Sequence, residues 1–278
     1  MRAKKKKKQP KGLKILIGAT AASLLCVFVW IGFRLFREVR EENAYETENE
    51  NLQRLRPQLP TGAGGTTEPA GGNEGTPSDP EPAEPVNYLA ELQESNPDVA
   101  AWLTVPGTAI DFPVVQGGDN KYYLNHDLAG ESSKLGVPFL DVRCRRDFTD
   151  FNSIVYGHHI SGGRMFSELD KFREEAFFFE HPEATLITET HVYTVRLLAC
   201  LITPSDGFVY HTVFLSEDDR RIFLRDVRAN ALWLRDFSEE ELLSGSLLTL
   251  STCAYEYEGA RTVLIGALEE GSTKQGQP

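Results

Sequence analysis

Three side chains in the second half of the chain could together carry out nucleophilic chemistry. Cys253 ends the apolar run "SLLTLSTC", His158 follows a glycine in "FNSIVYGHH", and Arg261 opens the run "RTVLIGAL". A thiolate is a strong nucleophile, but it needs an acid/base partner and donors that stabilise a developing oxyanion. An imidazole suits the first task and a guanidinium the second. These residue types could therefore support covalent catalysis.

The spacing of these residues is compatible with one site but leaves a simpler interpretation open. Arg261 follows Cys253 after eight positions, so an antiparallel pair of strands would bring both to one end of a sheet. His158 and His159 would stand where a strand ends, unlike the other four histidines, at positions 126, 181, 191 and 211. Alternatively, Cys253 is a small buried apolar residue and Arg261 a solvated charge.

The cysteines indicate no metal site of the CxxC type and no disulfide framework. There are four, of which Cys26 lies in an apolar N-terminal run and Cys144, Cys200 and Cys253 are widely spaced. So few cysteines rarely form a framework, although a disulfide between two of the last three stays possible. A leftover thiol outside the cytoplasm would be a candidate reactive group.

Charge is distributed unevenly along the 278 residues, whose formal net charge is −12. Residues 1–40 contain 11 Lys and Arg and one Glu, whereas the rest of the chain contains 18 basic and 40 acidic residues. An acidic body argues against nucleic acid as its partner.

The basic tip precedes a candidate membrane span. Residues 15–33 read "ILIGATAASLLCVFVWIGF" without a charge, and a helix of that length rises about 28 Å, close to the thickness of a bilayer core. Lys4–Lys8 favour a cytoplasmic N-terminus, and no small-residue cleavage site follows the run. We therefore expect an uncleaved signal anchor and an extracytoplasmic body.

Composition predicts the organisation of the chain. "PQLPTGAGGTTEPAGGNEGTPSDPEPAEP" is too poor in apolar residues to form a core. The expected parts are a cytoplasmic basic tip at 1–12, a transmembrane helix at 13–36, a charged and Pro/Gly-rich extracytoplasmic linker at 37–86, a catalytic domain at 87–270 and a disordered tail at 271–278.

The domain should be mostly β. Short runs rich in Val, Ile, Thr and aromatic residues predict strands, including "IDFPVVQ", "VPFLD", "ATLITET" and "HVYTVRLLACLITP". Two short helices are expected over residues 86–108, broken at Asn96-Pro97, and longer ones over residues 166–182 and 216–234, the last with Ser216 as its N-cap. A β-barrel or sandwich with helical decoration follows.

The motifs resemble those of sortases, the membrane-anchored cysteine transpeptidases of Gram-positive bacteria. "TLSTC" is similar to the sortase TLxTC signature, "IVYGHH" to the strand-end histidine segment, and Arg261 follows at a sortase-like distance. "YYLNHDLAGESSKLGVPFLD", "VYGHHISGGRMFSEL" and a long helix before the cysteine strand resemble class B. The resemblance covers roughly residues 88–268. It implies a closed β-barrel of about eight strands with helical decorations.

The resemblance also implies roles. Cys253 would be the nucleophile, His158 the acid/base, and Arg261 the group that stabilises the oxyanion or binds the peptide, while His159 would be a surface or supporting residue. Residues expected to contact the substrate are Asn125, Tyr156, Tyr210, Ser251 and Thr252. No cofactor or metal is expected.

The implied reaction is the cleavage of an NPxTx sorting motif near the C-terminus of a secreted protein, followed by transfer of its Thr carbonyl to a peptidoglycan amine. The expected partners are therefore a sorting-signal peptide, a peptidoglycan precursor or cross-bridge amine, and the cytoplasmic membrane. Two alternatives stay open. One is a pilin-polymerising sortase with a Lys acceptor, and the other is a non-catalytic, membrane-tethered peptide-binding module.

Overall fold

The computed structural model describes residues 11–58, 86–160, 162–253 and 260–270. For residues 11–23, 38, 41–44, 48 and 253 it describes the backbone alone. Residues 1–10 of the predicted basic tip, most of the predicted linker and the predicted tail therefore lie outside the described residues. The chain divides into two compact units between residues 54 and 55, and each is considered by itself.

The first unit is a single helix, α1, that runs from Lys11 to Arg54. It includes the predicted span at 13–36 and continues through the charged residues that follow, so no boundary of secondary structure falls at residue 36. Within the part of the chain that the structure describes, none of the helices combines the length and the apolar character needed to cross a bilayer. The predicted anchor is thus not confirmed.

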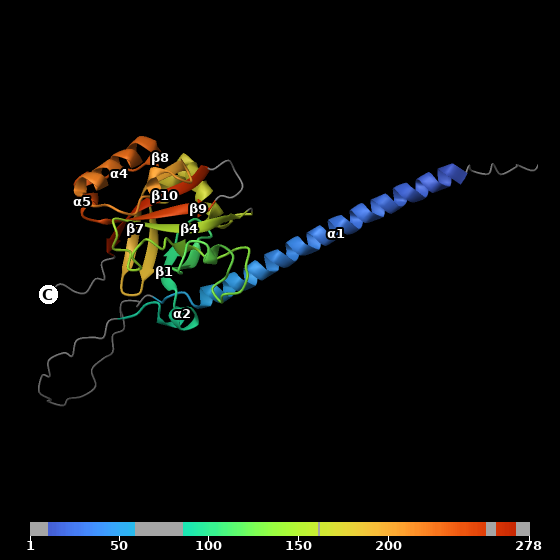
Figure 1. The fold of residues 1–278 in the computed structure, drawn as a ribbon, viewed down its shortest axis with the longest axis horizontal. Coiled ribbons are helices and arrows are strands. Elements are labelled where there is room, and N and C mark those ends of the chain that lie inside the picture. Colours follow the sequence, from blue (N-terminus) through green and yellow to red (C-terminus); the bar gives the residue numbers. More distant parts are fainter. Residues whose placement is uncertain (1–10, 59–85, 161, 254–259, 271–278) are drawn as a thin grey trace, which may run out of the picture. The chain divides into compact units, whose positions relative to one another are not determined.

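The second unit contains ten strands and several short helices among its described residues (Figure 1). The strands are β1 (Val99–Thr104), β2 (Asp111–Val115), β3 (Phe139–Leu140), β4 (Asn152–Ile160), β5 (Arg164–Met165), β6 (Glu183–Thr188), β7 (Val192–Pro204), β8 (Ala231–Leu234), β9 (Ser246–Cys253) and β10 (Ala260–Glu270). The α-helices are α2 (Ala90–Ser95), α3 (Glu175–Glu180), α4 (Glu217–Asn230) and α5 (Glu239–Leu243). The 3-10 helices are η1 (Tyr122–Leu124), η2 (Phe166–Arg173) and η3 (Phe208–Tyr210).

Eight of the strands close into a barrel. Neighbouring strands follow the order β10-β9-β4-β3-β2-β1-β6-β7, and β7 then pairs with β10 to complete the ring. Closure pairs the edges that an open sheet would leave exposed. The predicted closed β-barrel of about eight strands is confirmed, and β8 pairs in addition with β7 and β5 with β4.

Two expected helical segments are strands instead. Residues 99–104 form β1 between β2 and β6, and nearly every side chain there is buried. The sequence was misleading because a continuous apolar run has no period that distinguishes a strand from a helix. Residues 231–234 form β8 on the edge of β7, so the helix predicted over 216–234 ends at Asn230. The segment predicted as a helix over residues 166–182 divides into η2 and α3 at Glu174.

The helix α4 begins as the sequence predicts. The side chain of Ser216 accepts a hydrogen bond from the backbone N–H of Asp219, whose carboxylate accepts one from the N–H of Ser216. The helix buries Phe223, Leu224 and Val227 against the barrel. Figure 1 shows α4 and α5 together at one end of this unit and α2 at the other. The groups predicted to act in catalysis lie elsewhere, on β4, β9 and β10.

Candidate active site on three neighbouring strands

The strands β4, β9 and β10 bring the three predicted catalytic residues together. β9 runs parallel to β4, and their register places Cys253 directly beside His158. β9 runs antiparallel to β10, with Val263 opposite Ser251, and the same register continued by two residues places Arg261 opposite Cys253. Adjacent strands lie about 4.8 Å apart, so the three residues occupy neighbouring positions on consecutive strands.

A glycine before the histidine is required by packing. A Cβ atom added to Gly157 would lie 2.4 Å from Cγ of Phe166, the first residue of η2. Phe166 is fully buried, so its ring has no free space into which it could move. Gly157 therefore lets η2 approach the end of β4 closely, immediately beside His158.

The imidazole of His158 is held by the backbone. Its Nε2 atom lies 2.5 Å from the carbonyl oxygen of Leu124, the last residue of η1. A carbonyl oxygen only accepts hydrogen bonds, so Nε2 carries a hydrogen and donates it. The other ring nitrogen, Nδ1, is left to exchange a proton. Sequence reasoning missed Leu124, because a backbone contact has no side-chain signature.

The guanidinium of Arg261 lies over an aromatic ring, with an unused donor. Its Cζ atom is 5.7 Å from the ring centre of Tyr210. Its Nε atom is buried and has no hydrogen-bond partner within the described part of the chain. A buried donor without a partner is costly, and an acceptor on a bound ligand would remove that cost. A developing oxyanion or a peptide carbonyl is an acceptor of this kind.

Three of the predicted substrate contacts lie beside these residues. Tyr156 precedes His158 by two positions on β4, and Ser251 precedes Cys253 by two on β9, so strand alternation places them on the same face of the sheet as those positions. The hydroxyl of Tyr210 is 3.0 Å from Oγ of Ser251, and its ring stacks on that of Tyr156 at 6.1 Å between centroids. These three side chains therefore form one contiguous group beside the candidate catalytic positions.

The other two predicted contacts are placed differently. Thr252 is buried, and its hydroxyl accepts a hydrogen bond from the backbone N–H of Thr262, on the face of the sheet opposite to Ser251. Asn125 is exposed and follows directly after Leu124. The structure therefore brings Asn125 to the edge of the site and places the side chain of Thr252 on the face opposite to Tyr156 and Ser251.

A buried carboxylate supports the two tyrosines, and sequence reasoning missed it. Asp141 accepts hydrogen bonds from the hydroxyl of Tyr156 at 3.0 Å and from Nε and Nη2 of Arg143 at 2.9 and 2.7 Å. Arg143 also donates to the carbonyl of Tyr210 at 3.4 Å. Burial alone would raise the pKa of Asp141, but the hydrogen bonds from Arg143 outweigh it and the pKa is lowered. Burial and this charge raise the pKa of Tyr156 far above its usual value, so its hydroxyl stays protonated.

The remaining cysteines of the domain are buried and unreactive. Cys144 and Cys200 are free and buried, and burial raises the pKa of each thiol to about 12. Since any disulfide among the three cysteines of the domain would include one of them, the possible disulfide is excluded. Neither forms an appreciable thiolate at neutral pH, which leaves Cys253 as the candidate nucleophile.

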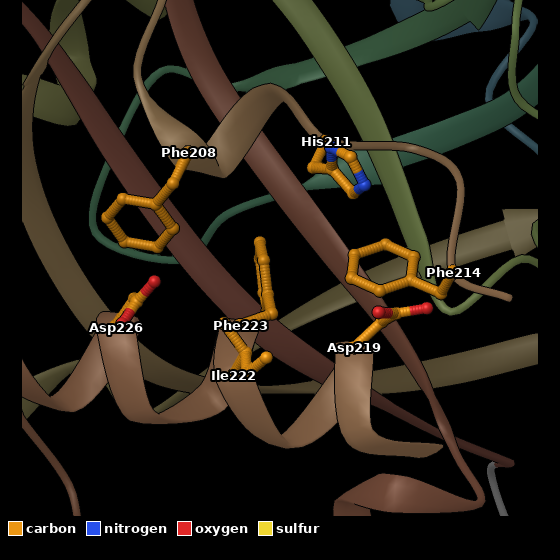
Figure 2. Close-up of a pocket in the computed structure, with 7 residues that line it drawn as sticks. All are labelled: Phe208, His211, Phe214, Asp219, Ile222, Phe223 and Asp226. Atoms are coloured by element: carbon orange, nitrogen blue, oxygen red, sulfur yellow. The ribbon is translucent and has the colours of Figure 1, made fainter. Parts of the chain in front are cut away.

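A separate cavity of about 210 Å³ lies between α4 and the loop after η3. Figure 2 shows the ring of Phe223 between Phe208 and Phe214, with Asp219 and Asp226 along the helix and His211 above. The lining contains neither His158 nor Arg261. This cavity is therefore distinct from the candidate active site.

Comparison with protein-family models gives no match for this chain. Two curated relatives are nevertheless similar over most of their length. Sortase B of Listeria monocytogenes is 34% identical over 184 residues, which cover 65% of this chain and 73% of the relative. Sortase B of Staphylococcus aureus is 27% identical over 179 residues, 64% of this chain and 72% of the relative.

Solved structures agree with these relatives. A Staphylococcus aureus sortase B–substrate complex has a TM-score of 0.64 at 26% identity and covers 68% of this chain and 88% of its own. A Streptococcus pyogenes class B sortase involved in pilus biogenesis has a TM-score of 0.59 at 34% identity, and the match covers 65% of this chain and 97% of that structure's chain. By sequence and by fold, this chain belongs to the sortase family of cysteine transpeptidases and is most similar to its class B.

Proposed function

We propose that this sortase cleaves an NPxTx-type sorting motif near the C-terminus of a secreted protein and joins the Thr carbonyl to a peptidoglycan amine. The observation that carries the proposal is the strand register, which sets Cys253 beside His158 with Arg261 on the next strand. The similarity to a Staphylococcus aureus sortase B–substrate complex supports a substrate site in this fold. A catalytically silent module has no support, since the family is one of transpeptidases.

In the first half of the reaction, the Cys253 thiolate attacks the Thr carbonyl carbon. Arg261 donates to the oxyanion of the tetrahedral intermediate. The imidazolium of His158 gives the proton on Nδ1 to the leaving amine, while Nε2–H stays on the carbonyl of Leu124. The C–N bond breaks, and a thioester between Cys253 and the upstream part of the substrate remains.

In the second half, a primary amine attacks the thioester. His158 takes a proton from the attacking nitrogen through Nδ1, and the C–S bond breaks to release the Cys253 thiolate. A new amide joins the Thr carbonyl to the acceptor. The acceptor amine is the second substrate, and no redox step is required, since both half-reactions are acyl transfers.

We further propose that the N-terminal segment anchors the enzyme in the cytoplasmic membrane. The support is the pattern of the sequence: an uncharged run over residues 15–33 after Lys4–Lys8. The N-terminus would be cytoplasmic, and the catalytic domain would lie outside the membrane of a Gram-positive bacterium. Tethering would raise the effective concentration of secreted substrates at the enzyme.

The decisive experiment measures the thioacyl intermediate directly. The full chain in detergent is mixed with an NPQTN-type peptide and analysed by intact mass, beside Cys253→Ala and the matched control Cys144→Ala. An adduct in the wild type and in Cys144→Ala, but not in Cys253→Ala, is the expected result. An adduct that persists in Cys253→Ala would refute Cys253 as the nucleophile. No adduct in the wild type, with Cys253 still labelled by a thiol reagent, would refute the NPxTx motif.

A second candidate function is pilin polymerisation, with a Lys side chain as the acceptor. The observation that favours it is the similarity to the Streptococcus pyogenes class B sortase involved in pilus biogenesis, at 34% identity. Competition between lysine-bearing pilin peptides and cross-bridge amines for the thioacyl enzyme would separate the two functions. A product joined mainly to the pilin peptide would replace the peptidoglycan acceptor in the proposal.

A further inference from the structure

A hydrogen-bonded cluster lies one residue away from each of the three candidate catalytic residues. It consists of His159, Asp170, Arg173, Thr252 and Thr262, which we call the supporting cluster. On β4, β9 and β10 its members directly follow His158, precede Cys253 and follow Arg261. Successive residues of a strand point to opposite faces, so the cluster lies on the reverse side of the sheet from the catalytic positions.

Asp170 is the centre of the supporting cluster. Its Oδ2 atom lies 2.7 Å from Nε2 of His159, and its Oδ1 atom accepts a hydrogen bond from the hydroxyl of Thr262 and lies 3.2 Å from Nε of Arg173. Since a carboxylate only accepts, His159 donates through Nε2. A single side chain of η2 thus contacts both β4 and β10.

Thr262 extends these contacts to the cysteine strand. Its hydroxyl accepts a hydrogen bond from Nε of Arg173 at 2.8 Å while it donates to Asp170. Its backbone N–H donates to the hydroxyl of Thr252 at 3.2 Å. Thr252 and Thr262 are both buried, so the bond between them is shielded from water and contributes more than an exposed one.

We propose that Asp170 is a positioning residue, which fixes the ends of β4, β9 and β10 against η2 so that His158, Cys253 and Arg261 keep their relative placement. The inference rests on the proposed function for the roles of those three residues. Misplacement of a catalytic group by about 1 Å can cost a factor of 10² in rate.

Asp170 is not needed to hold η2 on the barrel. Phe166, Leu169 and Phe172 of the same helix are fully buried and anchor it by apolar contact. Removal of the carboxylate should therefore leave the fold intact and loosen only the polar connections between η2 and the strand ends. An intact fold in a variant without the Asp170 carboxylate would distinguish a positioning role from a general role in stability.

The test compares Asp170→Ala, Thr262→Val and Thr262→Ser in the full chain in detergent, with Glu168→Gln as the control. Thr262→Val keeps the shape of the side chain and loses the hydroxyl, whereas Thr262→Ser keeps the hydroxyl. Glu168 is a second carboxylate of η2, which instead accepts hydrogen bonds from the backbone N–H of Ala109 and from Nζ of Lys171. For each variant, kcat and KM of peptide cleavage and Tm are measured.

The expected result is a loss of about 10- to 100-fold in kcat for Asp170→Ala and Thr262→Val, with KM and Tm little changed. Thr262→Ser and Glu168→Gln should stay within about 3-fold of the wild type, since their hydrogen bonds persist. Equal kcat in Asp170→Ala and the wild type would overturn the proposal. A fall in Tm large enough to explain the loss of kcat would also overturn the proposal, if Thr262→Ser were as inactive as Thr262→Val.

A second readout does not depend on the peptide. Alkylation of Cys253 by iodoacetamide, followed by intact mass at neutral pH, reports how well His158 supports the thiolate. We expect slower alkylation in Asp170→Ala than in Glu168→Gln, and equal rates would overturn the positioning role. A wild type inactive on the peptide would count against the proposed function, while the alkylation rates would still decide the role of Asp170.

Discussion

The Nε2 atom of His158 lies 2.5 Å from the carbonyl oxygen of Leu124, so a backbone group of η1 orients the imidazole at the end of β4. Because the carbonyl cannot donate, the neutral ring is confined to the tautomer with hydrogen on Nε2. Proton exchange with the substrate is thereby assigned to Nδ1. Among the residues that the structure describes, no carboxylate is hydrogen-bonded to this ring.

Substitution of His158 by glutamine should remove proton transfer while the contact with Leu124 is kept. The amide of Gln donates to a carbonyl as Nε2 does, but it exchanges no proton near neutral pH. We expect kcat for peptide cleavage to fall by about 10²- to 10⁴-fold. Single-turnover acylation, followed by intact mass, measures the effect.

The matched control for this prediction is His191→Gln. His191 lies in the turn between β6 and β7, where its ring nitrogen contacts the hydroxyl of Thr190. Activity should be unchanged there. A His158→Gln variant as active as this control would contradict the role of His158 as acid and base.

Arg261→Lys should show that the shape of the cation matters as well as its charge. Lysine keeps the positive charge but loses the planar group and the buried Nε donor, which has no partner among the described residues. We expect kcat to fall by about 10²-fold with a smaller change in KM, as for loss of an oxyanion donor. Arg196→Lys is the control, since Arg196 pairs with Glu269 at the far end of β10. A large rise in KM with kcat unchanged would instead assign Arg261 to substrate binding.

The sequence predicts those parts of the fold that have a clear local pattern of residue types. The strand runs were recognisable by their β-branched and aromatic residues, whereas β1 and β8 were mistaken for helix. The residues of β1 are buried on both faces and lack alternation, and those of β8 continue the apolar pattern of α4 without a proline or glycine to mark the break.

The candidate site was predictable where side chains carry the chemistry. Cys253, His158 and Arg261 follow from residue type and from motif resemblance, and the strand register then brings them together. Leu124 and Asp170 were not predictable, for two different reasons. The first contributes a backbone carbonyl, and the second is one carboxylate among many until the fold places it between His159 and Thr262.

Gly157→Ala should destabilise the domain through one methyl group. The added Cβ would lie 2.4 Å from the buried ring of Phe166, so η2 or the end of β4 must move. Overpacking of this kind costs about 1–3 kcal/mol in the free energy of unfolding. Urea unfolding measures it, with Gly118→Ala as the control, because no atom lies within 4 Å of a Cβ at that position. Equal stability of the two variants would show that η2 yields without cost.

The carboxylate of Asp141 should make stability depend on pH in the acid range. Burial alone would raise its pKa, but the hydrogen bonds from Arg143 lower it below the usual value of 3.8. A pKa that is lower in the folded state contributes stability above the unfolded pKa, and that contribution is lost as the pH falls through the folded pKa. Asp141→Asn should therefore lower the free energy of unfolding at pH 7 by about 1.5–3 kcal/mol and reduce the acid dependence below about pH 4.

Asp147→Asn is the matched comparison for the acid dependence. The hydrogen bond from Arg145 lowers the pKa of Asp147 to about 2, but both side chains are largely exposed, Arg145 at 68% and Asp147 at 52%. Solvent screens such a pair, so its removal should change the free energy of unfolding by less than about 1 kcal/mol. Thermal unfolding between pH 7 and pH 3 distinguishes the two carboxylates. If Asp141→Asn and the wild type lost stability equally on acidification, the carboxylate of Asp141 would not be the group whose protonation causes the loss.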